Sequence, residues 1–194
     1  MSDDIQKFTM ALFARLSKLD LLLLQCQQLY SSKETVSVLN DTAGLFFSII
    51  QEQLMDSILL GISNITDAEK ITGKNNLTIK KLPDMMPDES LKAEVKECCE
   101  KAVESSSFVR SHRNKRIAHF DEVYHLSSVP IVLDIATFQK VENALENIHS
   151  VLDLVSTKCF FTGLDRQFIG LRGSANELVA KLKYRTCTSF QQTS

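Results

Sequence analysis

Residues 105–121 form a basic window within a chain that is slightly acidic as a whole. Before Asp121 the window contains no acidic residue. Its basic residues and histidines are Arg110, His112, Arg113, Lys115, Arg116 and His119. Arg113, Asn114 and His119 bring together a permanent cation, an amide and a group that titrates near neutral pH. This combination is suited to binding a phosphate group and transferring protons beside it.

Metal-independent RNA cleavage requires three chemical functions. One group removes the proton of the ribose 2′-hydroxyl, a cation stabilises the charge that grows on the phosphoryl oxygens, and an acid protonates the leaving oxygen. His119 can act as base or acid, because the ordinary pKa of histidine is about 6.5. Arg113 can pair with two phosphate oxygens, and the amide of Asn114 can orient the phosphate or the histidine. Together these residues supply one half of such a site.

The spacing of Arg113 and His119 does not suit a regular α-helix. At about 100° per residue, six steps leave the two side chains about 120° apart around the helix axis. Lys115 and Arg116, four and three residues before His119, are its neighbours on a helix. Either the backbone departs from a regular helix in this window, or Arg113 reaches around the helix, or a second chain completes the pocket. The sequence leaves these three alternatives open.

Simpler interpretations of these residues must be weighed as well. An Arg followed closely by a His is a weak pattern, and a cationic helix end is often a solvated segment whose charges favour the carboxyl terminus of the helix. His112 and His125 are predicted to be exposed loop residues, and His149 to lie on a helix surface. No set of His, Cys, Asp and Glu has the spacing of metal ligands, and no glycine-rich phosphate loop is present. Neither a metal nor another cofactor is therefore expected.

The composition restricts the class of protein. The length of 194 residues fits one domain, or one domain with an appended helical hairpin, and a hydrophobic content of 44% is enough for a continuous core. Its net charge of −2 argues against a general polyanion binder, so any contact with nucleic acid must be local. Its five cysteines lack paired CxxC spacing, which indicates reduced thiols in the cytosol. Because the amino terminus does not resemble a secretory signal and the most apolar runs are short, we expect a cytoplasmic protein without a membrane partner.

Hydrophobic residues recur at steps of three and four along most of the chain, which is typical of amphipathic helices. The predicted helices cover residues 3–31, 39–62, 77–82, 89–109, 135–159 and 174–182. The predicted caps are Asn40 or Asp41, Asp134, and the reciprocal pair Ser174 and Glu177. The predicted fold class is all-α, an antiparallel bundle of at least four long helices plus short helices. We expect a single domain over residues 1–194, with a loose tail at 184–194.

The motif and its helical context resemble the HEPN superfamily, the higher eukaryote and prokaryote nucleotide-binding proteins. The signature of that superfamily is an Arg, a polar residue and, after a short spacer, a His. Residues 113–119, Arg-Asn-Lys-Arg-Ile-Ala-His, fit this signature. Residues 59–67 and 73–79, and the ending His119-Phe-Asp121, are similar to the branch named for a type U phage abortive-infection protein. The resemblance covers roughly residues 40–160 and extends in weaker form to the whole chain.

This resemblance implies a homodimer in which two copies of the motif form one metal-independent ribonuclease site. It implies catalytic roles for Arg113 and His119 and a helper role for Asn114, and it assigns no role to Asp67. Arg110, Lys115 and Arg116 do not belong to the signature, and we expect them only to contact RNA. Family members often act as toxins or antiviral effectors that cut RNA. The predicted function is therefore an endoribonuclease of a bacterial defence or toxin–antitoxin system, with RNA as substrate and a cognate antitoxin as a further partner.

The alternative is a non-catalytic helical module that binds a partner protein, RNA or a nucleotide. The overall acidity and the lack of a broad basic face favour this alternative. The position of Arg113 distinguishes the two hypotheses. If Arg113 and His119 converge in an open cleft of a dimer, a ribonuclease is favoured, whereas a buried salt bridge of Arg113 within its own subunit favours a binding module.

Overall fold

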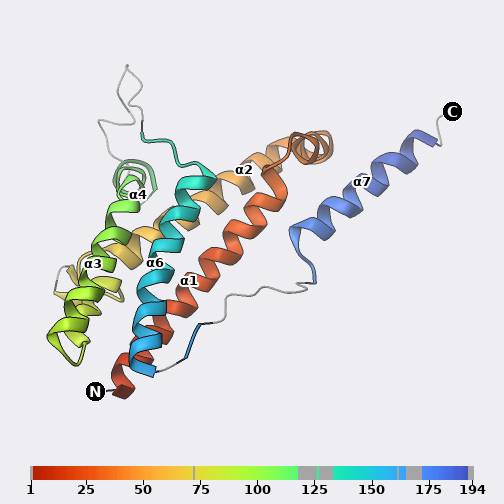
Figure 1. Cartoon of the computed structure of the whole chain (residues 1–194). Helices are drawn as coiled ribbons and strands as arrows, with labels where there is room; N and C mark the ends of the chain where they lie inside the picture. The colour runs from red at the N-terminus through yellow and green to blue at the C-terminus, as the bar shows by residue number, and fades with distance from the viewer. Residues whose placement is uncertain are drawn as a thin grey trace. The chain divides into compact units, whose positions relative to one another are not determined.

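The computed structural model describes residues 2–71, 73–117, 126, 133–160, 162–164 and 172–191. Within this part of the chain most residues are helical, which confirms the all-α fold class (Figure 1). The long helices are α1 (Ser2–Tyr30), α2 (Lys33–Thr66), α3 (Glu89–Ser105), α6 (Phe138–Phe160) and α7 (Ala175–Gln191). The short elements are strands β1 (Lys70–Ile71) and β2 (Lys74–Asn75), the 3-10 helices η1 (Ile79–Lys81) and η2 (Pro83–Met85), the helix α4 (Phe108–His112) and the π-helical turn η3 (Arg113–Ile117).

The chain divides into two compact units. The first contains residues 1–19 and 59–166, and the second contains residues 20–58 and 167–194. Helices α1 and α2 therefore contribute part of their length to each unit. The single domain expected over residues 1–194 groups both units together and stays a prediction.

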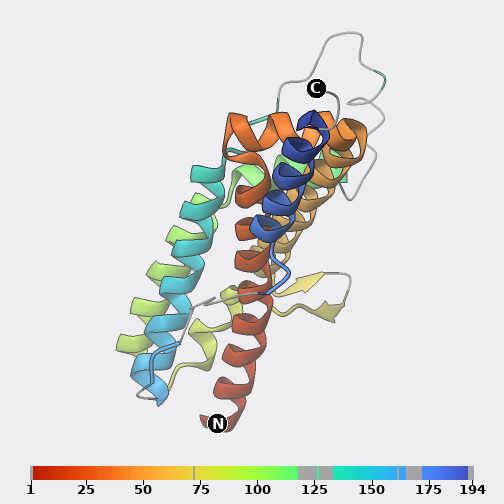
Figure 2. The same cartoon turned by 90° about the vertical axis from the view of Figure 1, so that its right-hand side faces the viewer.

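In the first unit, helices α1, α2, α3 and α6 each bury an apolar stripe. α3 and α6 lie side by side and run in opposite directions (Figures 1 and 2). The helical period brings the apolar residues of α6 to one face, and that face is buried. Buried core residues of this unit include Leu12 and Leu16 of α1, Leu59 and Ile62 of α2, Val95 and Ala102 of α3, and Val141, Ile148 and Leu152 of α6.

Gly61 of α2 sits against α1 in the first unit. A Cβ atom built on Gly61 would lie 2.4 Å from Cδ2 of Leu19. Leu19 is itself buried, so its side chain has little space to move aside. The absence of a side chain at Gly61 thus permits a close approach of the two helices.

In the second unit, α2 begins directly after α1. The Ser32 hydroxyl accepts a hydrogen bond of 3.1 Å from the N–H of Thr35 and so caps α2. The predicted start near Asn40 or Asp41 is therefore wrong. The helix is kinked close to that point, however, because Ala43 has non-helical angles (φ −162°, ψ 65°). The sequence suggested a helix start there because Asn and Asp are typical capping residues.

Helix α7 belongs to the second unit, and its amino terminus is capped by side chains of α1. Gln25 Oε1 accepts a 2.7 Å hydrogen bond from the Ala175 N–H, and Gln28 Oε1 accepts one of 3.1 Å from the next N–H. Ala175 and Val179 then pack in an apolar cluster with Leu29, Leu39 and Phe47. α7 continues to Gln191, so its backbone is helical beyond the predicted start of the loose tail.

Two other helix starts test the sequence predictions. Asp88 Oδ1 accepts a 2.8 Å hydrogen bond from the Leu91 N–H and caps α3, which begins at Glu89 as predicted. Asp134 was expected to cap α6, but this helix begins at Phe138, and the Asp134 carboxylate pairs with Lys140 Nζ at 2.6 Å instead. His149 was expected on the surface of this helix, yet it is 1% exposed. The hydrophobic periodicity thus located the helices. The positions of their ends and the burial of His149 depend on tertiary contacts.

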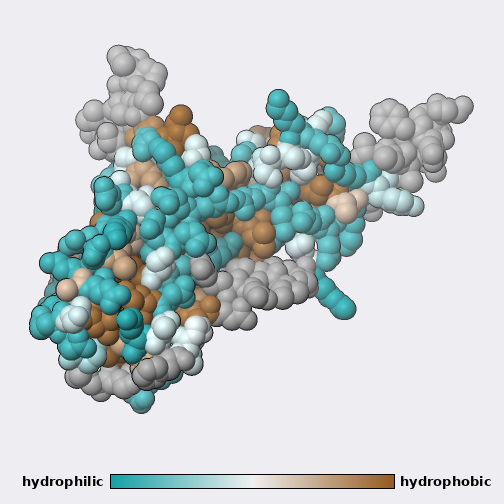
Figure 3. Space-filling model, in the orientation of Figure 1, coloured by the Kyte–Doolittle hydropathy of each residue, from teal (hydrophilic) through white to brown (hydrophobic). Residues whose placement is uncertain are grey.

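Among the described helices, α2 is long and apolar enough by length and composition to cross a membrane. Only 22% of its most apolar window is buried in the protein. Leu45, Phe46 and Ile49 are among its exposed apolar residues. On the face shown in Figure 3, apolar patches are interrupted by hydrophilic side chains. Core helices of soluble proteins pass the same length and composition test.

Candidate functional site

The basic window lies where α3 gives way to irregular helix. α3 ends at Ser105, α4 covers only Phe108–His112, and Arg113–Ile117 form the π-helical turn η3. A π-turn pairs each residue with the fifth residue along the chain instead of the fourth, and such turns occur frequently at functional sites. The backbone therefore departs from a regular α-helix directly after Arg113, which is one of the three alternatives that the sequence left open.

Arg113 forms an ion pair inside the first unit. Its Nη1 atom donates a 2.9 Å hydrogen bond to Oδ1 of Asp67. The Arg113 side chain is 22% exposed and the Asp67 side chain is 11% exposed. Asp67 directly follows the last residue of α2, and it stands 46 positions before Arg113 in the chain. The tertiary fold thus places a carboxylate beside the cation of the motif.

Arg110 contacts the same end of α2. Its Nη2 atom donates a 3.0 Å hydrogen bond to the carbonyl oxygen of Thr66, the last residue of the helix. The carboxyl terminus of a helix carries partial negative charge and unpaired carbonyl groups, so a guanidinium is a favourable partner there. Arg110 was expected to contact RNA, and in the structure this part of its side chain is engaged with the protein.

Of the remaining residues in the window, the structure describes the side chain of Asn114 but not those of Lys115, Arg116 and His119. Asn114 is exposed at the second position of η3. Lys115 and Arg116 follow it in the turn, but their side chains lie outside the described residues. His119 and His125 also lie outside them. The structure therefore brings Arg110 and Arg113 together at the end of α2, with Asn114 beside them in the chain.

His112 is buried, and its predicted position in an exposed loop is wrong. It is 9% exposed, and its Nε2 atom lies 2.7 Å from the carbonyl oxygen of Asp134. Because a carbonyl oxygen only accepts hydrogen bonds, Nε2 carries the proton in this contact. Nδ1 is buried without a hydrogen-bond partner among the described residues. This contact connects His112, which directly precedes Arg113, to Asp134, which lies shortly before the start of α6 at Phe138.

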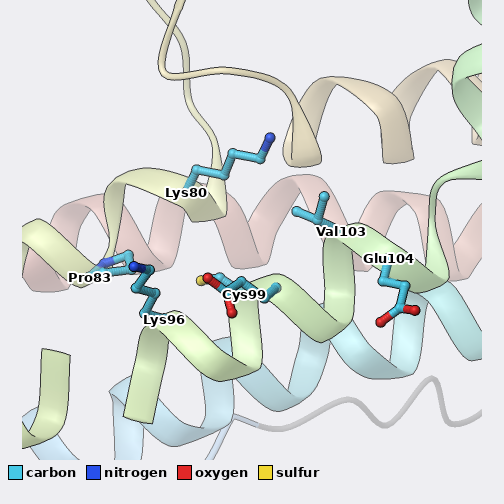
Figure 4. A pocket seen from close by; sticks show the side chains of 7 residues that line it. Lys80, Pro83, Lys96, Cys99, Val103 and Glu104 are labelled. Atoms are coloured by element: carbon cyan, nitrogen blue, oxygen red, sulfur yellow. The ribbon is translucent and has the colours of Figure 1, made fainter. Parts of the chain in front are cut away.

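A separate pocket of about 430 Å³ lies between α3 and the segment that contains η1 and η2. Figure 4 shows Pro83 and Lys96 near one end of this pocket and Val103 and Glu104 near the other. Burial raises the pKa of the Cys99 thiol in the wall of the pocket to about 12, so this cysteine is a poor nucleophile at neutral pH. None of the described residues of the basic window lines the pocket. Within the described ranges, no group of His, Cys, Asp and Glu side chains has the arrangement of a metal site.

The sequence match to a known family covers both Asp67 and the whole basic window. The model of the HEPN AbiU2 family matches residues 4–178. The chain belongs to this family. No curated protein and no solved structure matches it significantly.

In this HEPN chain, Asp67 is the site residue that sequence reasoning did not assign. An Asp after an apolar helix gives no sign of a functional role in the sequence. Its partner, Arg113, is 46 positions further along the chain, so only the folded structure shows their contact. A buried carboxylate requires a partner, so a buried Asp beside a motif arginine becomes a candidate only when the fold is known. The HEPN match confirms the resemblance seen in residues 113–119, and it does not by itself assign an activity.

Proposed function

We propose that this HEPN chain is a metal-independent endoribonuclease in which Arg113 and His119 act on the scissile phosphate and Asn114 orients it. The observation that carries the proposal is the placement of Arg113 and Asn114 at the start of the π-turn η3. The Arg113 side chain is 22% exposed, and Asn114 is exposed. A partly exposed cation beside an exposed amide is an arrangement that can bind a phosphate group.

The proposed reaction is attack of the ribose 2′-oxygen on the adjacent phosphorus. His119 of one copy accepts the proton of the 2′-hydroxyl as the new bond between the 2′-oxygen and phosphorus forms. The bond between phosphorus and the 5′-oxygen breaks, and His119 of the second copy gives its proton to the leaving oxygen. Arg113 stabilises the negative charge on the non-bridging oxygens. The products are a 2′,3′-cyclic phosphate and a free 5′-hydroxyl.

This mechanism requires a homodimer, because each chain carries one copy of the motif. We propose RNA as the substrate and a toxin or antiviral role in a bacterial cytoplasm, with a cognate antitoxin as the partner that keeps the activity silent. Lys115 and Arg116 then contribute to RNA binding through the phosphate backbone. Replacing both by Ala should lower the affinity for RNA and reduce its dependence on salt concentration.

Cleavage of a labelled single-stranded RNA in the presence of EDTA tests the proposal. The wild type should cut and leave 2′,3′-cyclic phosphate ends, which mass spectrometry detects. His119→Ala and Arg113→Ala should each lose cleavage, while Arg15→Ala, an exposed arginine of α1, serves as a matched control. No cleavage by the wild type, or equal cleavage by His119→Ala, would refute the proposal.

The ion pair of Arg113 supports a second candidate, a non-catalytic module that binds RNA, a nucleotide or a partner protein. A salt bridge within the same subunit is the feature expected of this alternative, and the Arg113 side chain is mostly buried in one. The pair engages one nitrogen of the guanidinium, however, and the side chain keeps some exposure. RNA binding by the wild type without cleavage, together with equal binding by His119→Ala, would favour this second candidate.

A further inference from the structure

Asp67 is held in place by the end of α2 and by the segment that precedes η1. The Thr78 hydroxyl lies 2.8 Å from the carbonyl oxygen of Ile65 and 2.9 Å from that of Asp67. Thr78 is fully buried. Because both carbonyl groups face one buried hydroxyl, the backbone at Asp67 has little freedom, and the carboxylate projects from a fixed point.

Two arginines of the basic window meet this fixed point. Arg110 contacts the Thr66 carbonyl oxygen at 3.0 Å, and Arg113 contacts the Asp67 carboxylate at 2.9 Å. The two arginines are three positions apart, so they leave the same side of the chain at successive turns. The start of η3 is therefore fastened to the end of α2 at two neighbouring points.

The ion pair with Asp67 uses one nitrogen of the Arg113 guanidinium. Arginine has five N–H donors in a rigid plane, and the hydrogen bond to Asp67 uses Nη1. Among the described residues, Arg113 has no other side-chain hydrogen bond, so its Nε and Nη2 edge is not occupied by any of them. Asp67 thus holds one nitrogen of the guanidinium, and an arginine has further N–H donors with which it can bind an anion.

We propose that Asp67 is a positioning residue, which fixes the orientation of the Arg113 guanidinium for the phosphate. The inference rests on the proposed ribonuclease function. Asp67 does not touch the reacting atoms and acts through Arg113. A long arginine side chain has many rotamers, and a fixed carboxylate removes most of them before the substrate binds.

The test compares Asp67→Ala, which removes the acceptor, with Asp67→Asn, which keeps an oxygen of the same size and position. Asp67→Ala should lower kcat for RNA cleavage by on the order of 100-fold with little change in KM. Asp67→Asn should recover part of that loss. Asp84→Ala is the matched control, because it removes a carboxylate that pairs with Lys92 at the same distance of 2.9 Å. The control should leave kcat unchanged.

The folded fraction of each variant is measured by circular dichroism, and cleavage is expressed per folded molecule. Equal kcat in wild type and Asp67→Ala would overturn the inference. A higher kcat in both variants would overturn it as well, since it would mean that the carboxylate competes with the phosphate for Arg113. A loss of the same size in Asp67→Asn and Asp67→Ala would also count against it, because the amide keeps the acceptor.

NMR of ¹⁵N-labelled arginine side chains separates this inference from the proposed function. Slow rotation of the Arg113 guanidinium in the wild type, and fast rotation in Asp67→Ala, are the expected results without any substrate. Identical Arg113 signals in both proteins would overturn the positioning role even if the wild type cleaves RNA. Ordering of Arg113 by Asp67 in a wild type that does not cleave would instead refute the proposed function and leave the holding of Arg113 by Asp67 established.

Discussion

Gly61→Ala is expected to destabilise the protein, although the same change stabilises most helices. In a helix interior, Ala is favoured over Gly by roughly 0.5–1 kcal/mol, because Gly loses more backbone entropy on folding. Gly61 differs because a Cβ atom there would lie 2.4 Å from Cδ2, 3.1 Å from Cδ1 and 3.2 Å from Cγ of Leu19. Leu19 is 6% exposed, so these atoms cannot all move away into solvent.

The size of the effect follows from two opposing contributions. An extra methyl group in a tightly packed core typically costs about 1–3 kcal/mol. Subtracting the gain in helix propensity of roughly 0.5–1 kcal/mol leaves a net loss on the order of 1 kcal/mol. For a chain of this length, that corresponds to a fall in Tm of about 2–4 °C.

Urea denaturation followed by circular dichroism measures the change, with Gly44→Ala as the matched control. Gly44 lies in the same helix directly after the kink at Ala43, and the nearest atom to its added Cβ would be Asn40 Oδ1 at 3.5 Å, an ordinary contact. Gly44→Ala should therefore cause no packing loss, and the stability should change little. Equal shifts of the denaturation midpoint in both variants would refute the argument from packing.

A double-mutant cycle with Leu19→Ala identifies the opposing group. Leu19→Ala alone should cost about 2–5 kcal/mol, because it empties a buried site. In that background the new methyl group of Gly61→Ala enters free space, so the second substitution should become neutral or stabilising. An unchanged effect of Gly61→Ala in the two backgrounds would mean that Leu19 is not the group that it meets.

Three further predictions concern other parts of the chain. Asp88→Ala should lower the free energy of unfolding by about 1 kcal/mol in urea denaturation, because the N–H of the first turn of α3 loses the acceptor that now binds it at 2.8 Å. Burial raises the pKa of Cys26 to about 11 and that of Cys99 to about 12. Iodoacetamide at pH 8 should therefore spare both thiols in the folded protein and modify both in urea, and mass spectrometry that finds rapid labelling without urea would contradict their burial. Lys140→Met should raise the pKa of Asp134 toward the ordinary value of an aspartate in an NMR titration, because the hydrogen bond from Lys140 now lowers it. Because the pKa of Asp134 is lower in the folded state than in the unfolded state, its pair with Lys140 stabilises the fold at pH values above the unfolded-state pKa. This contribution to the free energy of unfolding should vanish as the pH falls through the folded-state pKa of Asp134.

The helices and the motif were largely accessible from the sequence, for a local reason. The repeat of apolar residues at steps of three and four depends only on neighbours along the chain, and it located α1, α3, α6 and most of α2. The all-α class follows from this repeat, whereas the HEPN resemblance rests on the motif at residues 113–119, and both are confirmed. The roles of Arg113, Asn114 and His119 stay predictions that the proposed cleavage assay can test.

Helix ends and buried polar residues were less accessible, because their partners are distant in the chain. Ser32 starts α2 in place of Asn40 or Asp41, and Asp134 pairs with a lysine instead of capping α6. His112 and His149 resemble surface residues in the sequence, yet the packing around them leaves both buried. A histidine carries polar and apolar character at once, so its burial is decided by the elements that cover it.

The sequence by itself determined that the chain is helical and that a cation, an amide and a histidine occur in one basic window of a HEPN protein. These features depend on residue type and short-range spacing. Only the tertiary structure decided that Arg113 meets Asp67 and that Arg110 meets Thr66 at the end of α2. Both contacts span more than forty residues, and they form because folding brings the end of one helix beside the start of an irregular turn.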